Sequence, residues 1–136
     1  MSRRHPQFNR DALAEALRQN GVEYQHMQSL GGRREPSPKS TNTALRNEQF
    51  RGYADYMQTP EFDGALDELL ALLPDERTAV MCAEALPVSC HRSLLSDAVL
   101  ARGIAVVHVI PGSERPHELS PHARVEDGSV RYPALL

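Results

Sequence analysis

The chain has 136 residues, of which 40% are hydrophobic and 24% are charged, and its formal net charge is −3. These values are typical of one globular domain, residues 1–136, with a core of its own. No apolar run approaches the ~20 residues that a membrane-spanning helix needs. The presence of only two cysteines, and of no apolar segment behind the basic start Met1–Pro6, predicts a cytoplasmic protein with reduced thiols.

The charges are divided unevenly along the chain. Residues 1–51 carry nine Lys/Arg against five Asp/Glu, whereas residues 52–136 carry six against thirteen. A basic half can attract a nucleic acid or another phosphate-bearing partner, but an ordinary solvated surface also shows a bias of this size.

Four stretches have the apolar spacing of amphipathic helices. The third has the clearest boundaries, because Thr59 is a good N-cap, Pro60 suits the first helical position and Pro74 ends the stretch. The four predicted helices cover residues 10–20, 47–57, 60–73 and 91–102.

Three stretches predict strands: residues 22–27 alternate, 78–81 are apolar, and 104–110 give the strongest strand signal. The span 78–110 has the length of a strand, a crossover helix and a parallel strand. We therefore predict an α/β fold, a three-layer sandwich with a short, mainly parallel central sheet and flanking helices. A small hairpin or an irregular cover is expected around Gly128-Ser129, and residues 35–46 are predicted to be a loop that could cover a site as a mobile flap.

The two cysteines flank a polar loop that is the main candidate site. Cys82 follows an expected strand, at the edge of the sheet where α/β proteins bind ligands. Cys90 lies at the expected start of the last helix, where free N–H groups lower a thiol pKa and favour anions. Arg92 has planar donors for a phosphate-like group. We predict Cys90, or failing that Cys82, as the nucleophile, with Glu84 or His91 transferring protons.

A second stretch, Leu30–Arg33, could form the opposite wall of this site. Gly31 and Gly32 let the backbone approach a ligand closely, and Arg33 could hold an anion, with Tyr53 at the side. A plain surface turn explains these residues equally well.

Other interpretations of the cysteine loop are weaker. The Arg of rhodanese-like and cysteine-phosphatase loops follows the Cys by six positions, whereas here the spacings from Cys82 and Cys90 to Arg92 are ten and two. A zinc site of Cys82, Cys90 and His91 would have seven residues between its cysteines, which is atypical, and a reversible disulfide needs a close approach. The residues also fit a structural role, with Cys82 as a buried small hydrophobe. We expect no metal and no cofactor.

The signature residues resemble one family. The segment Cys82-Ala83-Glu84 … Cys90-His91-Arg92, together with Phe50–Met57 and Arg3–Asn9, is similar to the family called domain of unknown function 488. The resemblance implies an α/β sandwich and little established biochemistry, and it favours a functional role for Glu84, Cys90 and the two residues after it. A small-molecule or nucleotide site is thus the first hypothesis, and a non-enzymatic nucleic-acid-binding module or a zinc protein is the alternative.

The resemblance also reveals a departure. Family members usually have a strand, a helix and a second strand before the motif that corresponds to Arg3–Asn9, and here the chain begins at that motif. We therefore expect about thirty residues, one βαβ-sized unit, to be missing. An open sheet edge invites pairing with another chain, so we expect the chain to self-associate or to be only marginally stable.

Overall fold

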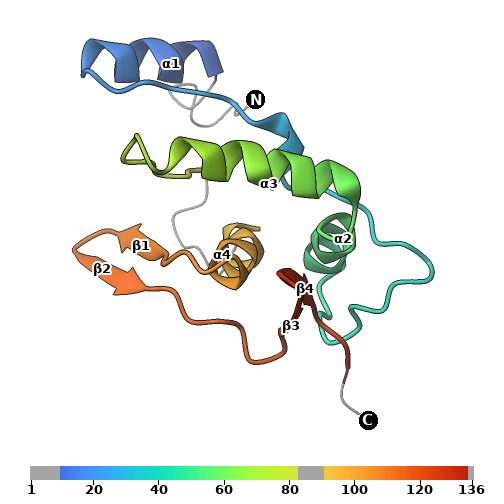
Figure 1. The fold of residues 1–136 in the computed structure, drawn as a ribbon. Helices are drawn as coiled ribbons and strands as arrows, with labels where there is room; N and C mark the ends of the chain where they lie inside the picture. The colour runs from blue at the N-terminus through green and yellow to red at the C-terminus, as the bar shows by residue number, and fades with distance from the viewer. Residues whose placement is uncertain (1–9, 83–90, 135–136) are drawn as a thin grey trace.

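The computed structural model describes residues 10–82 and 91–134 (Figure 1). Within these ranges, a short 3-10 turn at Gln28–Leu30 separates the first helix from the rest. None of the described helices has the length and apolar character that crossing a membrane requires. The helices are α1 (Arg10–Gln19), α2 (Glu48–Tyr56), α3 (Pro60–Leu72) and α4 (Arg92–Ala101).

Side-chain caps explain where two of the helices begin. The Asn47 side chain accepts hydrogen bonds from the N–H groups of Gln49 and Phe50 at the start of α2. Thr59 caps α3 by accepting from the N–H of Phe62, with proline at the first helical position. These groups satisfy N–H donors that have no partner inside the helix. The four helices predicted from the sequence are confirmed, with no end shifted by more than one residue.

The strands form two antiparallel hairpins. Strand β1 (Val107–Ile110) pairs with β2 (Ser113–Pro116) across a turn in which Gly112 has a φ of +80°. Strand β3 (Arg124–Glu126) pairs with β4 (Ser129–Arg131). Asp127 and Gly128 link this second pair with φ values of 51° and 80°, which is the backbone that two-residue hairpin turns favour. The hairpin expected in this region is confirmed, with its turn one residue earlier.

The predicted three-layer sandwich with a mainly parallel central sheet is wrong. Residues 22–27 and 78–81 form no strand, and only the end of the expected strand 104–110 is one. The partner of β1 is the segment directly after it. A two-residue turn closes this pair at a small entropic cost, whereas a parallel partner at 78–81 requires a long crossover.

The buried core joins α2, α3, α4 and the second hairpin. Tyr53 and Tyr132 are fully buried in it, and the backbone of Ala44 donates to the carbonyl of Tyr132 at 3.0 Å. The described part of α1 adds no side chain to this core, and Figure 1 shows α1 at one edge of the molecule. Its buried members are Leu30, Tyr53, Ala54, Met57, Phe62, Ala65, Leu66, Leu69, Leu94, Leu95, Ala98, Val99, Ala123, Val130 and Tyr132.

The loop 35–46, interpreted from sequence as a flap, is tied to α2. The Asp55 carboxylate accepts hydrogen bonds from the Ser37 N–H at 2.8 Å, the Ser40 hydroxyl at 2.6 Å and the Asn42 amide at 2.7 Å. The Asn42 side-chain oxygen also accepts from the Tyr132 N–H at 2.8 Å. These bonds tie the loop to α2 and to the core.

Candidate functional site

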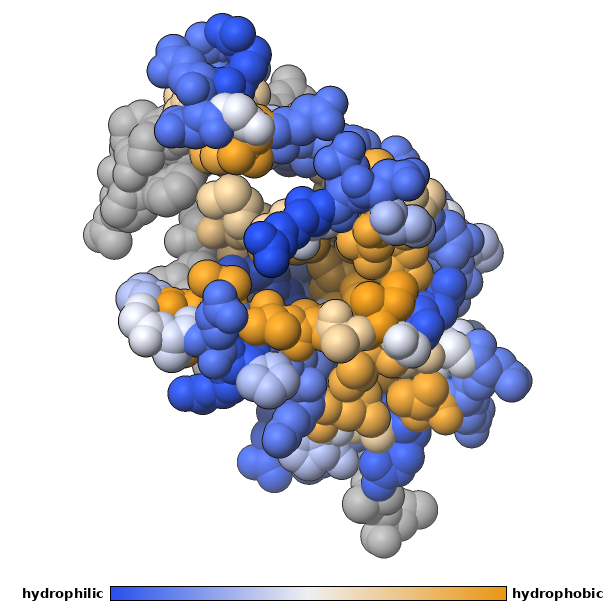
Figure 2. Space-filling view, turned by 60° about the vertical axis from the view of Figure 1, so that its left-hand side comes forward, coloured by the Kyte–Doolittle hydropathy of each residue, from blue (hydrophilic) through white to orange (hydrophobic). Residues whose placement is uncertain are grey.

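A groove with a volume of about 700 Å³ lies between the end of α3, the segment 77–80, α4 and residues 104–109. Figure 2 shows hydrophobic side chains gathered around a hollow on the side of the molecule where β1 and β2 lie. Apolar walls with a few polar groups are typical of small-molecule sites. The polar residues of this lining are Arg77, Thr78, Arg92, Ser96, His108 and Glu114.

Arg92 is half-buried and is the first residue of α4. Its carbonyl accepts a hydrogen bond of 2.6 Å from the Ser96 hydroxyl, and the preceding residue, His91, makes no side-chain cap bond at this helix start. The guanidinium group and the N–H groups of a helix start both favour an anion. Arg92 therefore makes the α4 wall the candidate place for a negatively charged group.

His91 packs against two of the residues predicted for the opposite wall. Its ring centroid lies 5.1 Å from that of Tyr53, and a Cβ atom on Gly32 would come within 2.8 Å of its Nδ1. Only glycine lets the 31–33 stretch approach this closely. Burial, and next the charge of Arg92, lower the pKa of His91, so the ring is neutral at pH 7 and suited to accept a proton.

The remaining predicted residues lie apart from the groove or outside the described chain. Arg33 is exposed, with a φ of 62°, while its neighbour Arg34 covers the ring of Tyr56 at 3.7 Å. Cys82 is half-buried. Glu84 and Cys90 lie outside the described residues. Of the predicted binding residues, Arg92 lines the groove, whereas Gly31, Gly32, Arg33 and Tyr53 do not.

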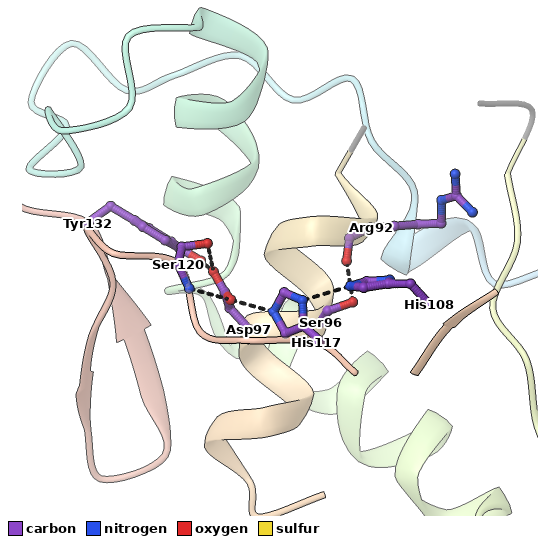
Figure 3. A network of polar contacts seen from close by, with 7 residues as sticks. All are labelled: Arg92, Ser96, Asp97, His108, His117, Ser120 and Tyr132. Atoms are coloured by element: carbon purple, nitrogen blue, oxygen red, sulfur yellow. Dashed lines mark hydrogen bonds and ion pairs between the residues drawn. The ribbon is translucent and has the colours of Figure 1, made fainter. Parts of the chain in front are cut away.

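The structure reveals a polar chain that the sequence interpretation missed (Figure 3). Asp97 on α4 is fully buried. Its Oδ1 is 2.7 Å from Nε2 of His117, and Nδ1 of His117 is 2.7 Å from Nε2 of His108. Asp97 also accepts bonds from the Ser120 N–H and hydroxyl and from the Tyr132 hydroxyl, the last two at 2.7 Å. This hydrogen-bonded network begins at Asp97 in the core and ends at the groove, because His108 is one of the residues that line the groove.

Burial and neighbouring charges shift the pKa values of two members of this network, His108 and Tyr132. Burial lowers the pKa of His108, and the charges of His117, Arg92 and Arg115 lower it further, against an opposing effect of Asp97. Burial and Asp97 raise the pKa of Tyr132 far above its usual range, so the hydroxyl stays a neutral donor. At neutral pH His108 is thus an uncharged imidazole on the groove wall.

One sequence signal could have indicated this network. Asp97 is three positions after Leu94 and directly before Ala98, within the apolar stripe that α4 turns toward the core. A carboxylate on a buried stripe must find partners. The partners His108 and His117 lie 11 and 20 positions later in the chain, and no local pattern links them.

Residues 10–82 and 91–134 contain no group of three or more His, Cys, Asp or Glu residues placed to hold a metal ion. The network of Asp97, His117 and His108 is a hydrogen-bonded chain with short N···N and N···O distances. Cys90, one of the zinc ligands considered from sequence, lies outside these residues.

Comparison with known proteins decides the family. Residues 1–99 match the family described as domain of unknown function DUF488. The chain belongs to the DUF488 family. This match confirms the resemblance found in the sequence. No curated protein and no solved structure matches the chain. The matched part of this DUF488 protein includes Arg92 and Asp97, whereas His108 and His117 follow it.

Proposed function

We propose that this DUF488 protein binds a small molecule with a phosphate-like anionic group in the groove, next to Arg92. The observation that supports this proposal is the place of Arg92, a half-buried guanidinium at the start of a helix and on the wall of a groove of about 700 Å³. A guanidinium forms two parallel hydrogen bonds with a phosphate or carboxylate, and removal from water strengthens them.

The rest of the lining favours a ligand with an apolar body. Leu69, Leu73, Leu95 and Val99 come from α3 and α4 and their ends, and Val106 lies on the other side. Burying an aromatic or aliphatic group against these side chains adds the hydrophobic part of the affinity. A phosphate ester with an apolar substituent therefore fits this site better than inorganic phosphate does.

The thiol remains part of the proposal. Cys90 is joined directly to His91, whose neutral ring lies beside Arg92 in the chain. We expect Cys90 to act as a nucleophile toward the bound molecule, with Glu84 or His91 moving the proton, and Cys82 as the second choice. Iodoacetamide alkylation of each cysteine across pH tests this role. Ordinary thiol pKa values near ~8.5 for both would remove its support.

Calorimetric titration tests the binding site. Phenyl phosphate, inorganic phosphate and benzyl alcohol separate the contributions of the charge and the ring. We expect phenyl phosphate to bind most tightly, and Arg92→Gln to weaken it by about 10- to 100-fold, the value of a charge-assisted hydrogen-bond pair.

The matched control is Arg102→Gln at the other end of α4. Arg102 forms an ion pair with Asp67 at 3.0 Å and is not part of the groove lining, so phenyl phosphate should bind this variant as it binds the unchanged protein. Equal affinities for Arg92→Gln and the unchanged protein, or no binding of any probe, would contradict the proposal.

A further inference from the structure

We propose that Nδ1 of His108 is a proton acceptor in the groove, backed by His117 and Asp97, that takes a proton from an acidic O–H of the molecule bound beside Arg92. This inference adds an acid–base site to the proposed function and rests on it for the ligand. The relay itself can be measured without any ligand.

With both rings neutral, the Asp97 carboxylate assigns which ring nitrogen carries each proton, because a carboxylate only accepts. Asp97 accepts from Nε2 of His117 at 2.7 Å, so Nδ1 of His117 has a lone pair when the ring is neutral. That lone pair accepts the Nε2–H of His108 at 2.7 Å. A neutral His108 with its proton on Nε2 has its own lone pair on Nδ1. The buried carboxylate thus orients both rings and leaves one basic nitrogen at the groove end.

The backbone holds the two rings in this arrangement. The N–H of His117 donates to the carbonyl of Val106 at 2.8 Å, two residues before His108. The ring centroids lie 4.8 Å apart with planes at 83°. The His117 side chain is 7% exposed, so water cannot easily replace its partners. The geometry is that of a fixed relay in which the rings have little freedom to rotate.

Charged groups around His108 come from each element packed against it. Arg115 is its cross-strand partner on β2, and Arg92 and Glu114 line the same groove. Figure 3 shows Arg92 and His108 on the same side of α4, at the end of the network opposite to Tyr132. The positive neighbours favour the neutral ring before the ligand binds, whereas a bound anion favours the protonated ring.

The proton transfer balances without a further reactant. The O–H bond of a phosphate monoester monoanion breaks, an N–H bond forms at Nδ1 of His108, and the oxygen keeps the electron pair beside Arg92. The Nε2 proton of His108 can then move to Nδ1 of His117. The positive charge then lies on His117 next to the Asp97 carboxylate, where an ion pair stabilises it. Asp97 and His117 are positioning residues, and His108 contacts the ligand.

A network that only held the fold together would not need His108 and His117. Asp97 already ties Ser120 and Tyr132 to α4 through three hydrogen bonds. Two histidines extend the same carboxylate to the groove wall, although His108 lies on a strand whose neighbours Val107 and Val109 are 53% and 72% exposed. The extension gives the groove an oriented base.

Nitrogen-15 NMR of the imidazole rings at pH 7.5 tests the relay in the unchanged protein. We expect His108 and His117 each to show a single tautomer, with the proton on Nε2 and none on Nδ1. The exposed His122 is the internal control and should show the averaged signals of a freely exchanging ring. Averaged signals at His108, or a proton on its Nδ1, would overturn the proposal.

His117→Gln is the variant that isolates the coupling. It should abolish the fixed tautomer of His108, because the acceptor of its Nε2–H is removed. Asp97→Asn should abolish the fixed tautomer of His117. An unchanged His108 spectrum in a folded His117→Gln variant would refute the relay. If the tautomers are fixed but phenyl phosphate does not bind, the anion site fails while the relay stands.

Discussion

The two sides of this molecule differ in how completely their apolar residues are covered. On one side, α2, α3, α4 and the second hairpin enclose Tyr53, Leu66 and Tyr132, whose exposed fractions are 1% or less. On the other side, Val80, Val107 and Val109 are between 46% and 72% exposed along the groove. The covered side supplies the stability, and the open side carries the exposed apolar surface on which we propose that a molecule binds.

The polar chain crosses the boundary between these sides. Asp97 and its bonds to Ser120 and Tyr132 belong to the covered side, whereas His108 reaches the open one. A functional side chain is positioned well when its supports are buried and fully hydrogen-bonded. In the described chain, no buried side-chain nitrogen or oxygen lacks a partner. The hydrogen-bonded core therefore holds His108 in position at the groove.

The largest expected effect on the covered side is that of Gly52→Ala in α2. A Cβ at this position would lie 1.9 Å from the carbonyl oxygen of Arg34, so the loop could not stay in place. We expect the free energy of unfolding to fall by about 3 kcal/mol or more, measured by urea denaturation.

Gly64→Ala is the matched control, because Gly64 is also in a helix but has nothing within 4 Å of its added Cβ. It should raise stability by about 0.5–1 kcal/mol. A Gly52→Ala variant as stable as Gly64→Ala would show that α2 and the 31–35 stretch are not packed as described.

A pair of truncations compares the two sides directly. Leu66→Ala removes a side chain that is 1% exposed, and it should cost about 2–5 kcal/mol through lost burial and the cavity left behind. Val109→Thr changes a residue that is 72% exposed, and it should alter stability by less than about 0.5 kcal/mol. Chemical denaturation of both variants gives the two values. A large loss in Val109→Thr would mean that this face is covered.

Much of the helical structure could be predicted from the sequence, because caps and apolar spacing act within a few residues. Asn47, Thr59 and Pro60 determine helix starts by local bonds. The sheet could not be predicted, because pairing depends on a choice between distant partners. β2 has the polar sequence Ser113–Pro116, so it lacked a strand signal, and β1 was assigned to the wrong neighbour.

The part of the candidate site that depends on local sequence signals could be predicted, and the part that depends on distant partners could not. Arg92 at a helix start was found because both signals are local, and it lines the groove. His108 was interpreted only as part of a strand, since its partners His117 and Asp97 are brought near it by folding. The position of Asp97 in an apolar stripe is the one local signal of the network. It does not indicate which residues donate hydrogen bonds to the carboxylate.

The smallest expected effect is a dependence of stability on acid. Burial lowers the pKa of His91 and His108 in the folded protein, so the unfolded chain binds protons more tightly. Stability is then full above the unfolded value near ~6.5 and falls as pH drops below it. Thermal melts between pH 7.5 and 5 should show this loss.

His91→Gln and His108→Gln should each reduce this sensitivity to acid. A melting temperature that is independent of pH in this window, or variants that are as sensitive to acid as the unchanged protein, would contradict the assigned burial of the two rings.

The pKa of His108 with and without phenyl phosphate tests the central claim, that an anion binds beside an oriented base on the open side. Ring NMR across pH gives this value directly in the unchanged protein. An anion next to Arg92 favours the protonated ring, so we predict that saturating phenyl phosphate raises the pKa of His108. A pKa of His108 that does not move at saturation would contradict the account.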